Sequence, residues 1–353
     1  MNCSSRSKRE SNIELMRIVS MIFVLITHAS YLTLDPPSQA DISTSLFDSL
    51  MRSLCESFTK VCVNAFILIS GWYGISGKIG RFLELVFQAL FISISIYIVL
   101  RVLGLTPAMG VSEWLRILLF KHKGYWFVRA YIVLYLFAPV LNTFVENTER
   151  KLFRIFIVCF YIVQTIYGFY NYGGWYAGGY SPLSFMGLYL LSRYMRLYPN
   201  RYTQYNKSID ILIYIVISVF TAVCSLALTY LTGKGGTVLF LYASPLMVLS
   251  SVYFFLFFTK LSFYSRFVNW VAASCFAVYL VHTLPFIYHP YYADIVRHWF
   301  DVETRYFFVL NTSKLIVLYF VLSVLFDKIR VCAWRNALGM ISLLYKRTNK
   351  LER

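Results

Sequence analysis

Apolar runs long enough to cross a bilayer recur along the whole chain, and no other feature of the sequence constrains the fold as strongly. A transmembrane helix needs about 20 mainly apolar residues. Runs of this kind predict ten spans, near 13-34, 55-75, 82-105, 125-145, 152-170, 182-198, 209-231, 237-258, 268-288 and 306-327. Only 14% of the 353 residues are charged, against about 25% in an average soluble domain. The sequence therefore predicts an all-α integral membrane protein, a bundle of about ten transmembrane helices.

The positions of lysine and arginine give this bundle an orientation. A net charge of +17 would suggest a nucleic-acid partner in a soluble chain, but in membrane proteins these residues concentrate in cytoplasmic loops. With the N-terminus inside, the predicted inner segments hold about three lysines or arginines for each one outside. We therefore expect no nucleic-acid partner and both termini in the cytoplasm, with a basic N-terminus at 1-12, a transmembrane domain at 13-327 and a basic tail at 328-353.

The first predicted span carries two ionisable residues, Arg17 and His28. Eleven residues at about 100° each bring them to one helix face, about 16 Å apart along the axis. An ionisable group at membrane depth costs at least about 2.5–3.5 kcal/mol, so we expect this face to border a protein interior or a wet cavity. The alternatives are an ion pair between Arg17 and Glu14, and a hydrogen-bonded packing role for His28.

Further polar residues fall near the depth of His28 when each span is measured at 1.5 Å per residue. This predicted outer polar layer contains His282, Gln164, Arg129 and Lys314. Snorkelling is an alternative reading of the last two, and it fits Arg129 better than the deeper Lys314. The spans hold no carboxylate at mid-depth, and we expect Glu56 to pair with Lys60, four residues later.

The segments at the two membrane surfaces differ in character. Near the inner surface Arg81 and Lys78 accompany Arg17, although both also satisfy the positive-inside rule. On the outer side a stretch from Ser112 to Lys121 is amphipathic. The outer loop 171-181 contains Trp175 and Tyr176 on a glycine-rich backbone, which suits stacking on a sugar ring and equally suits an interfacial aromatic belt. The seven cysteines show no metal-ligand spacing, so we expect no metal.

Four stretches, in order, resemble the membrane acyltransferase type 3 family. They are NIELMRIVSMIFVLITHAS with its Arg, ten residues, His pattern, VNAFILISGWYGI at 63-75, GYWFVRAYIVLYLFAPVLN at 124-142 and FAVYLVHTLPF at 276-286. One departure is Trp72, which stands where the family's Ser-Gly-Tyr segment carries tyrosine. Some members of the family also append a soluble esterase-like domain, and we expect this chain to act without one or with a separate partner.

The resemblance implies transfer of an acyl group, most often acetyl, from cytoplasmic acyl-CoA to a hydroxyl of an extracytoplasmic or lipid-linked glycan. It implies a bacterial plasma (inner) membrane enzyme with acyl-CoA (acetyl-CoA) as co-substrate, a saccharide acceptor and membrane lipids as partners. The acylated sugar, the acyl group and any homo-oligomer stay open.

The resemblance also implies roles for individual residues, some in binding the acyl donor and others in the transfer to the acceptor. His28 would be the general base, since burial disfavours the imidazolium form, or would carry the acyl group as an acyl-histidine intermediate. His282 would assist it or merely pack. Arg17, Arg81 and Lys78 would bind the acyl-CoA phosphates. The transfer point or the acceptor would be contacted by Arg129, Lys314, Gln164, Trp175 and Tyr176.

A transporter or flippase for glycan intermediates is the rival interpretation, because it too needs polar residues along a path. Such a protein is expected to show repeat symmetry and helices broken by glycine or proline near the middle of the membrane, and neither is clear in the sequence.

Overall fold

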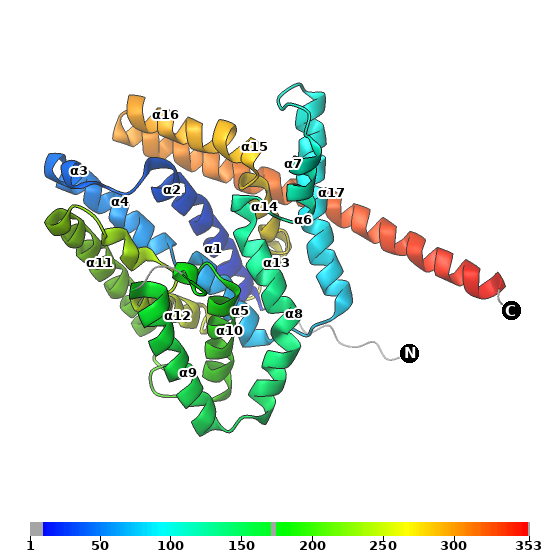
Figure 1. Cartoon of the computed structure of the whole chain (residues 1–353), viewed down its shortest axis with the longest axis horizontal. Helices are drawn as coiled ribbons and strands as arrows, with labels where there is room; N and C mark the ends of the chain where they lie inside the picture. The colour runs from blue at the N-terminus through cyan, green and yellow to red at the C-terminus, as the bar shows by residue number, and fades with distance from the viewer. Residues whose placement is uncertain (1–9, 171–173, 352–353) are drawn as a thin grey trace.

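The computed structural model describes residues 10–170 and 174–351, and these form helices joined by short segments, with no strand among them (Figure 1). Most of the predicted basic N-terminus and part of the 171-181 loop lie outside the described residues. The α-helices are α1 Ser11–Ala29, α2 Tyr31–Leu34, α3 Gln39–Thr44, α4 Leu46–Thr59, α5 Cys62–Tyr73, α6 Ile79–Val102, α7 Val111–Leu118, α8 Trp126–Asn147, α9 Arg150–Gln164, α10 Pro182–Leu197, α11 Lys207–Thr232, α12 Pro245–Thr259, α13 Arg266–Ala272, α14 Cys275–His282, α15 Pro285–Tyr288, α16 Asp294–Val302 and α17 Arg305–Leu351. Short 3-10 or π turns occupy Lys123–Tyr125, Thr165–Tyr170, Ala177–Gly179, Gly236–Phe240 and His289–Ala293.

The helices of the described residues confirm a multi-pass membrane protein. Seven stretches are long and apolar enough to span a bilayer, or eight if the bent pair Arg266–His282 and Pro285–Val302 is one span. The predicted count of ten is not confirmed, because the predicted spans at 182-198 and 306-327 correspond to α10 and α17, which lie outside this set. The orientation of the termini stays a prediction.

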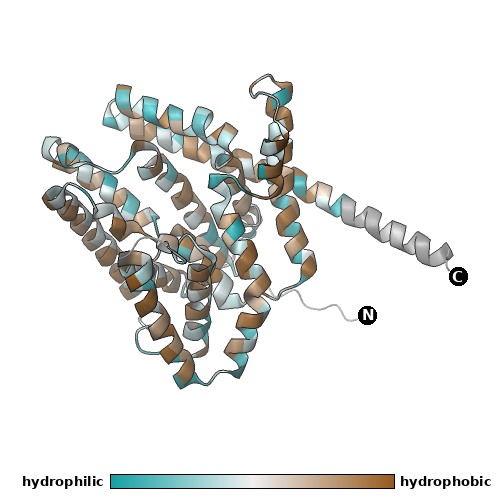
Figure 2. Cartoon of the chain, viewed as in Figure 1, coloured by the Kyte–Doolittle hydropathy of each residue, from teal (hydrophilic) through white to brown (hydrophobic). Residues whose placement is uncertain are grey.

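The outward faces of several helices are apolar, as contact with lipid requires. Val102 on α6 is 81% exposed and Leu231 on α11 is 78% exposed. Figure 2 shows hydrophobic residues along the outward-facing helices, while hydrophilic residues gather on α16 and in connecting segments. Apolar side chains in such numbers on the outside of a soluble protein would cause aggregation, whereas in a bilayer they face acyl chains of similar polarity.

The helix α1 lies inside the bundle and contacts α4, α5, α12, α13, α14 and α17. Its first turn is fixed by polar contacts rather than by apolar packing alone. Ser11 Oγ donates to Asn269 Oδ1 at 3.0 Å, and Asn12 Nδ2 donates to the Phe258 carbonyl at 3.0 Å. Because α1 is anchored at this end, the positions of its later residues relative to the neighbouring helices are fixed.

Two breaks interrupt stretches that the apolar pattern treated as continuous spans. The predicted span 268-288 is wrong as a single helix, since the chain bends by 81° between His282 and Pro285. Proline lacks a backbone N–H and forces the preceding residue out of the helical region, and Leu284 is accordingly extended at ψ 130°. The second break falls at Lys60, between α4 and α5.

Candidate functional site

A cavity of about 1130 Å³ lies along one face of α1. Met21, Val24 and His28 line it, and their spacing of three and four residues is that of one helical face. Most of the remaining wall comes from α5, α7, α8, α14 and α15 and from connecting segments, among them 106-109, 121-124 and those that carry Tyr180 and Tyr242. Its aromatic members are Phe66, Trp126, Phe127, Tyr180, Tyr242, Phe276, Tyr279, Phe286 and Tyr288. The cavity combines a mainly apolar wall with a few polar groups, as small-molecule sites commonly do.

The two histidines singled out in the sequence are hydrogen-bonded to each other. Nε2 of His282 lies 2.8 Å from Nδ1 of His28, although the residues are 254 positions apart. His282 is fully buried, whereas His28 lines the cavity. The structure therefore places one ring at the cavity wall and the other directly behind it.

The hydrogen bonds of this pair determine which nitrogen carries each proton. Nδ1 of His282 lies 2.6 Å from the carbonyl oxygen of Val278, and a carbonyl can only accept, so this nitrogen carries hydrogen. In neutral His282 the other nitrogen, Nε2, is then an acceptor, and Nδ1 of His28 must donate to it. This assignment leaves Nε2 of neutral His28 with a free lone pair, which can accept a proton.

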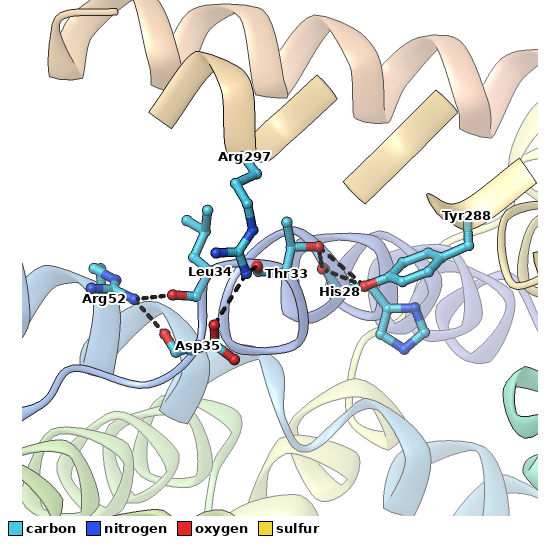
Figure 3. A network of polar contacts seen from close by, with 7 residues as sticks. All are labelled: His28, Thr33, Leu34, Asp35, Arg52, Tyr288 and Arg297. Atoms are coloured by element: carbon cyan, nitrogen blue, oxygen red, sulfur yellow. Dashed lines mark hydrogen bonds and ion pairs between the residues drawn. The ribbon is translucent and has the colours of Figure 1, made fainter. Parts of the chain in front are cut away.

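The backbone at His28 is held by hydroxyl groups at the end of α1 (Figure 3). The His28 carbonyl accepts from Thr33 Oγ1 at 2.6 Å and from Tyr288 Oη at 3.2 Å, and the two hydroxyls are 3.1 Å apart. A helix leaves its last carbonyls without partners within the helix. Here those partners come from α2 and from α15, so the position of His28 depends in part on the segment after the bend.

The turn at Asp35, which follows α2, is fixed by two arginines (Figure 3). Asp35 has a φ of 59°, which a residue other than glycine seldom adopts. Arg297 pairs with its carboxylate at 3.1 Å and donates to the Thr33 carbonyl. Arg52 donates to the Leu34 carbonyl at 3.0 Å. These contacts stabilise the turn and the end of α2, which supplies Thr33 to the His28 carbonyl.

Lys60, which lines the same cavity as His28, belongs to a buried ion pair. Lys60 Nζ is 2.9 Å from Glu56 Oε1, with side chains 13% and 1% exposed, so the predicted pairing of these residues is confirmed. Thr27 and Thr59 are hydrogen-bonded at 2.8 Å. These threonines directly precede His28 and Lys60 in the chain, and both His28 and Lys60 line the cavity. Sequence reasoning counted Lys60 as a residue within a span but gave it no place in the site.

Three aromatic rings from distant segments meet at the cavity wall near Lys60. Trp126 and Tyr180 have centroids 4.6 Å apart, and Tyr180 and Tyr242 have centroids 4.8 Å apart. Lys60 Nζ is 5.2 Å from the centre of the Tyr242 ring, within the range of a cation–π contact. The 171-181 loop does supply a ring to the cavity, but the ring belongs to Tyr180 and not to the residues predicted there.

A cationic segment, residues 116-123, borders the cavity at the end of α7 and in the connection to α8. Arg116, Lys121 and Lys123 all line it, with Glu113 as the acidic member. Arg129 does not line the cavity but holds this segment in place, since its guanidinium donates to the carbonyls of Phe120 and of His122, the latter at 2.9 Å. The predicted polar-layer residue Arg129 thus acts on the backbone of the loop.

The predicted donor-side residues lie away from this cavity. Arg17 Nη1 donates to Glu14 Oε1 at 2.8 Å, which is the alternative weighed for it, and its side chain is still 36% exposed. Arg17 is four residues before the cavity-lining Met21, so it continues the same face by one turn. Arg81 and Lys78 are exposed at the start of α6.

The other predicted residues lie elsewhere as well. Gln164 is buried on α9 with 1% exposure, and Lys314 is exposed on α17, 3.5 Å from Asn311 Oδ1. Trp175 is 86% exposed, and Tyr176 is 7% exposed with its ring against Phe160. None of these four belongs to the cavity lining of the described residues. Depth along a span placed Gln164 and Lys314 in one layer with His28, but they lie on α9 and α17, outside the cavity lining.

Within the described ranges, no group of three or more His, Cys, Asp or Glu residues could hold a metal ion.

A protein-family model described as an acyltransferase domain, type 3, matches residues 10–327. The match contains all residues that line the cavity. Neither curated proteins nor solved structures give a significant match to the chain.

Proposed function

This chain belongs to the membrane acyltransferase type 3 family, and from that premise we propose that it transfers an acetyl group from acetyl-CoA to a hydroxyl of a glycan, with His28 as general base. Family membership makes the protein an acyltransferase. The donor, the acceptor, the role of the histidine and a bacterial inner-membrane location with both termini in the cytoplasm are parts of the proposal.

The observation that carries the proposal is the His28–His282 pair at the wall of the cavity. A sugar hydroxyl is a poor nucleophile, and a neutral imidazole with a free lone pair is suited to remove its proton. The 2.8 Å hydrogen bond to His282 supports Nε2 of His28 as the accepting atom. His282 acts as a positioning residue in this scheme, because its second nitrogen is already committed to the Val278 carbonyl.

The reaction balances with these residues alone. The acceptor hydroxyl oxygen attacks the carbonyl carbon of the thioester while its proton passes to Nε2 of His28. The ester C–O bond forms and the C–S bond breaks. The proton then moves from His28 to the departing thiolate, which leaves as the free thiol of CoA.

The part of the proposal that concerns acyl-CoA binding rests on one observation: Arg17 and His28 lie on the same face of α1. Arg17 lies about 16 Å from His28 along the helix, one turn before Met21, the first residue of α1 that lines the cavity. A guanidinium at this place can bind a phosphate while the thioester, carried on a long flexible arm, reaches the histidine. Arg81 and Lys78 would add to the same phosphate-binding region.

The test is turnover of radiolabelled acetyl-CoA by the purified protein in lipid nanodiscs, with release of the CoA thiol as readout. His28→Ala should lower the rate by about 10² to 10⁴-fold, the usual contribution of a general base. His282→Ala should lower it by about tenfold, the equivalent of one hydrogen bond. The matched control is His298→Ala, which removes an exposed histidine on α16.

Two results would contradict the proposal. Full turnover by a folded His28→Ala protein, with folding checked by size exclusion, would remove the histidine from the chemistry. If the wild type neither binds nor consumes acetyl-CoA, transport of glycan intermediates becomes the better explanation, and the broken span after His282 is the observation that would favour it. Label bound to the protein before any acceptor is added would indicate an acyl-histidine intermediate instead of direct transfer.

A further inference from the structure

We propose that the cavity beside His28 takes an anionic saccharide, one that bears a carboxylate, phosphate or sulfate group, and that Arg116, Lys121 and Lys123 bind its acidic group. This inference rests on the proposed function, because it names the class of acceptor for the same site. It adds an acceptor subsite whose residues were not among those predicted from the sequence.

The first observation is the concentration of positive charge at one place on a face where lysine and arginine are scarce. By the predicted orientation the outer segments are poor in these residues, yet three of them fall within eight positions, at 116-123, and all three line the cavity. In the part of the chain that the structure describes, none of the three forms an ion pair.

Other arginines on this face are already used by the protein. Arg297 pairs with Asp35 at 3.1 Å, and Arg305 pairs with Asp48 at 3.4 Å. These two arginines have carboxylate partners, whereas the three cations at the cavity share Glu113 as the acidic neighbour in the lining. Three cations against one carboxylate leave an excess of positive charge in the cavity lining, and this excess attracts an anion.

The second observation is that this segment is packed directly on the element that carries His282. Tyr125 Oη donates to the Leu280 carbonyl at 2.9 Å. A Cβ atom on Gly124 would lie 2.3 Å from the carbonyl oxygen of Thr283, so only glycine allows this approach. Lys123 and the histidine pair are therefore brought close enough for one saccharide to contact both.

The third observation is the aromatic wall formed by Trp126, Tyr180 and Tyr242. Aromatic faces pack against the C–H faces of sugar rings, while indole N–H and phenol O–H groups supply hydrogen bonds. Lys60 lies over the ring of Tyr242 at 5.2 Å, so the wall also carries a donor for sugar hydroxyls. A ring held there would leave its acidic group at the cationic segment and a hydroxyl facing His28.

The experiment measures equilibrium binding of defined probes to the full-length protein in phosphatidylcholine nanodiscs by isothermal titration calorimetry. The charged probes are trisaccharides of uronic acid, of a sialylated sugar and of a phosphorylated sugar, and maltotriose is the neutral probe of the same size. We expect at least one charged probe to bind ten times more tightly than maltotriose, with an affinity that falls as salt is raised.

The variant that tests the residues is the triple change Arg116→Gln, Lys121→Gln, Lys123→Gln, and the matched control is Lys234→Gln, an exposed outer cation outside the cavity lining. The triple variant should lose the tenfold preference while binding maltotriose as the wild type does, which also shows that it is folded. The control should behave as the wild type.

Several outcomes would overturn the inference. They are equal binding of neutral and charged probes, no binding of any charged probe, and an unchanged preference in the triple variant. Displacement of the charged trisaccharide by equimolar inorganic phosphate, or by phosphatidylglycerol in the nanodisc, would mark a simple anion or lipid-headgroup site and would also overturn it. Binding is measured without acetyl-CoA, so these failures are distinct from a loss of acyl transfer, which would contradict the proposed function alone.

Discussion

The buried ion pair between Glu56 and Lys60 gives the most quantitative prediction from this structure. The change is Glu56→Gln, which keeps the size of the side chain but removes its charge. Lys60 then stays 13% exposed in a cavity wall without its counter-ion. The expected result is a large loss of stability from the removal of one negative charge.

The magnitude follows from the geometry of the pair. At 2.9 Å between Lys60 Nζ and Glu56 Oε1, an effective dielectric constant of about 20 gives an attraction of about 6 kcal/mol before desolvation is counted. Removal of one partner from such a buried pair usually costs about 3–5 kcal/mol, because the other charge is left uncompensated. Replacement of both charges, as in Glu56→Gln with Lys60→Met, should leave the stability within about 1 kcal/mol of the wild type.

The assay is unfolding of the purified protein in mixed micelles by titration with sodium dodecyl sulfate, followed by tryptophan fluorescence. The matched control is Glu146→Gln on α8, an exposed glutamate whose replacement should change the free energy of unfolding by less than about 0.5 kcal/mol. A loss below about 1 kcal/mol for Glu56→Gln would refute the reasoning. So would a double variant as unstable as the sum of the single ones, because the two side chains would then not interact.

Three further predictions concern packing, the cationic loop and the donor. Gly71→Ala should destabilise the protein by about 1–3 kcal/mol in the same titration, because the new Cβ would lie 2.4 Å from a backbone carbonyl of α10; Gly80→Ala, with open space around it, should not. Arg129→Gln removes two hydrogen bonds to the loop carbonyls, so amide hydrogen exchange in 116-123 should become faster, and unchanged exchange would exclude this anchoring role. Arg17→Gln should raise the KM for acetyl-CoA about tenfold or more with little change in kcat, and an unchanged KM would remove the arginine from donor binding.

The two residues closest to the proposed chemistry could be found from the sequence. An ionisable side chain at membrane depth costs free energy, so its presence there indicates a specific role. His28 and His282 are ionisable groups in long apolar runs, and the structure places their ring centroids 4.9 Å apart. The same reasoning selected Gln164 and Lys314, which lie outside the cavity lining. The rise per residue gives the depth of a side chain, but the direction in which it points depends on how its helix packs.

The break after His282 shows a second feature that the apolar pattern of the sequence does not predict. Leu284 and Pro285 lie inside an apolar run, and hydropathy alone treats that run as one span. Proline permits a bend, but whether the chain bends depends on what the next segment can contact. Here Tyr288 and Tyr292 donate to the carbonyls of His28 and Leu25 on α1, at 3.2 and 2.7 Å.

The sequence by itself determined that this is a multi-pass helical membrane protein of the acyltransferase type 3 family, because apolar length and four ordered motifs are local properties of the chain. Only the tertiary structure decided which polar groups share a cavity. Lys60, Tyr180 and the cations of 116-123 join His28 there, and Arg129 supports the loop from outside. The physical reason is that a cavity is made by side chains from many helices, and the rotation of each helix about its axis is set by packing against its neighbours.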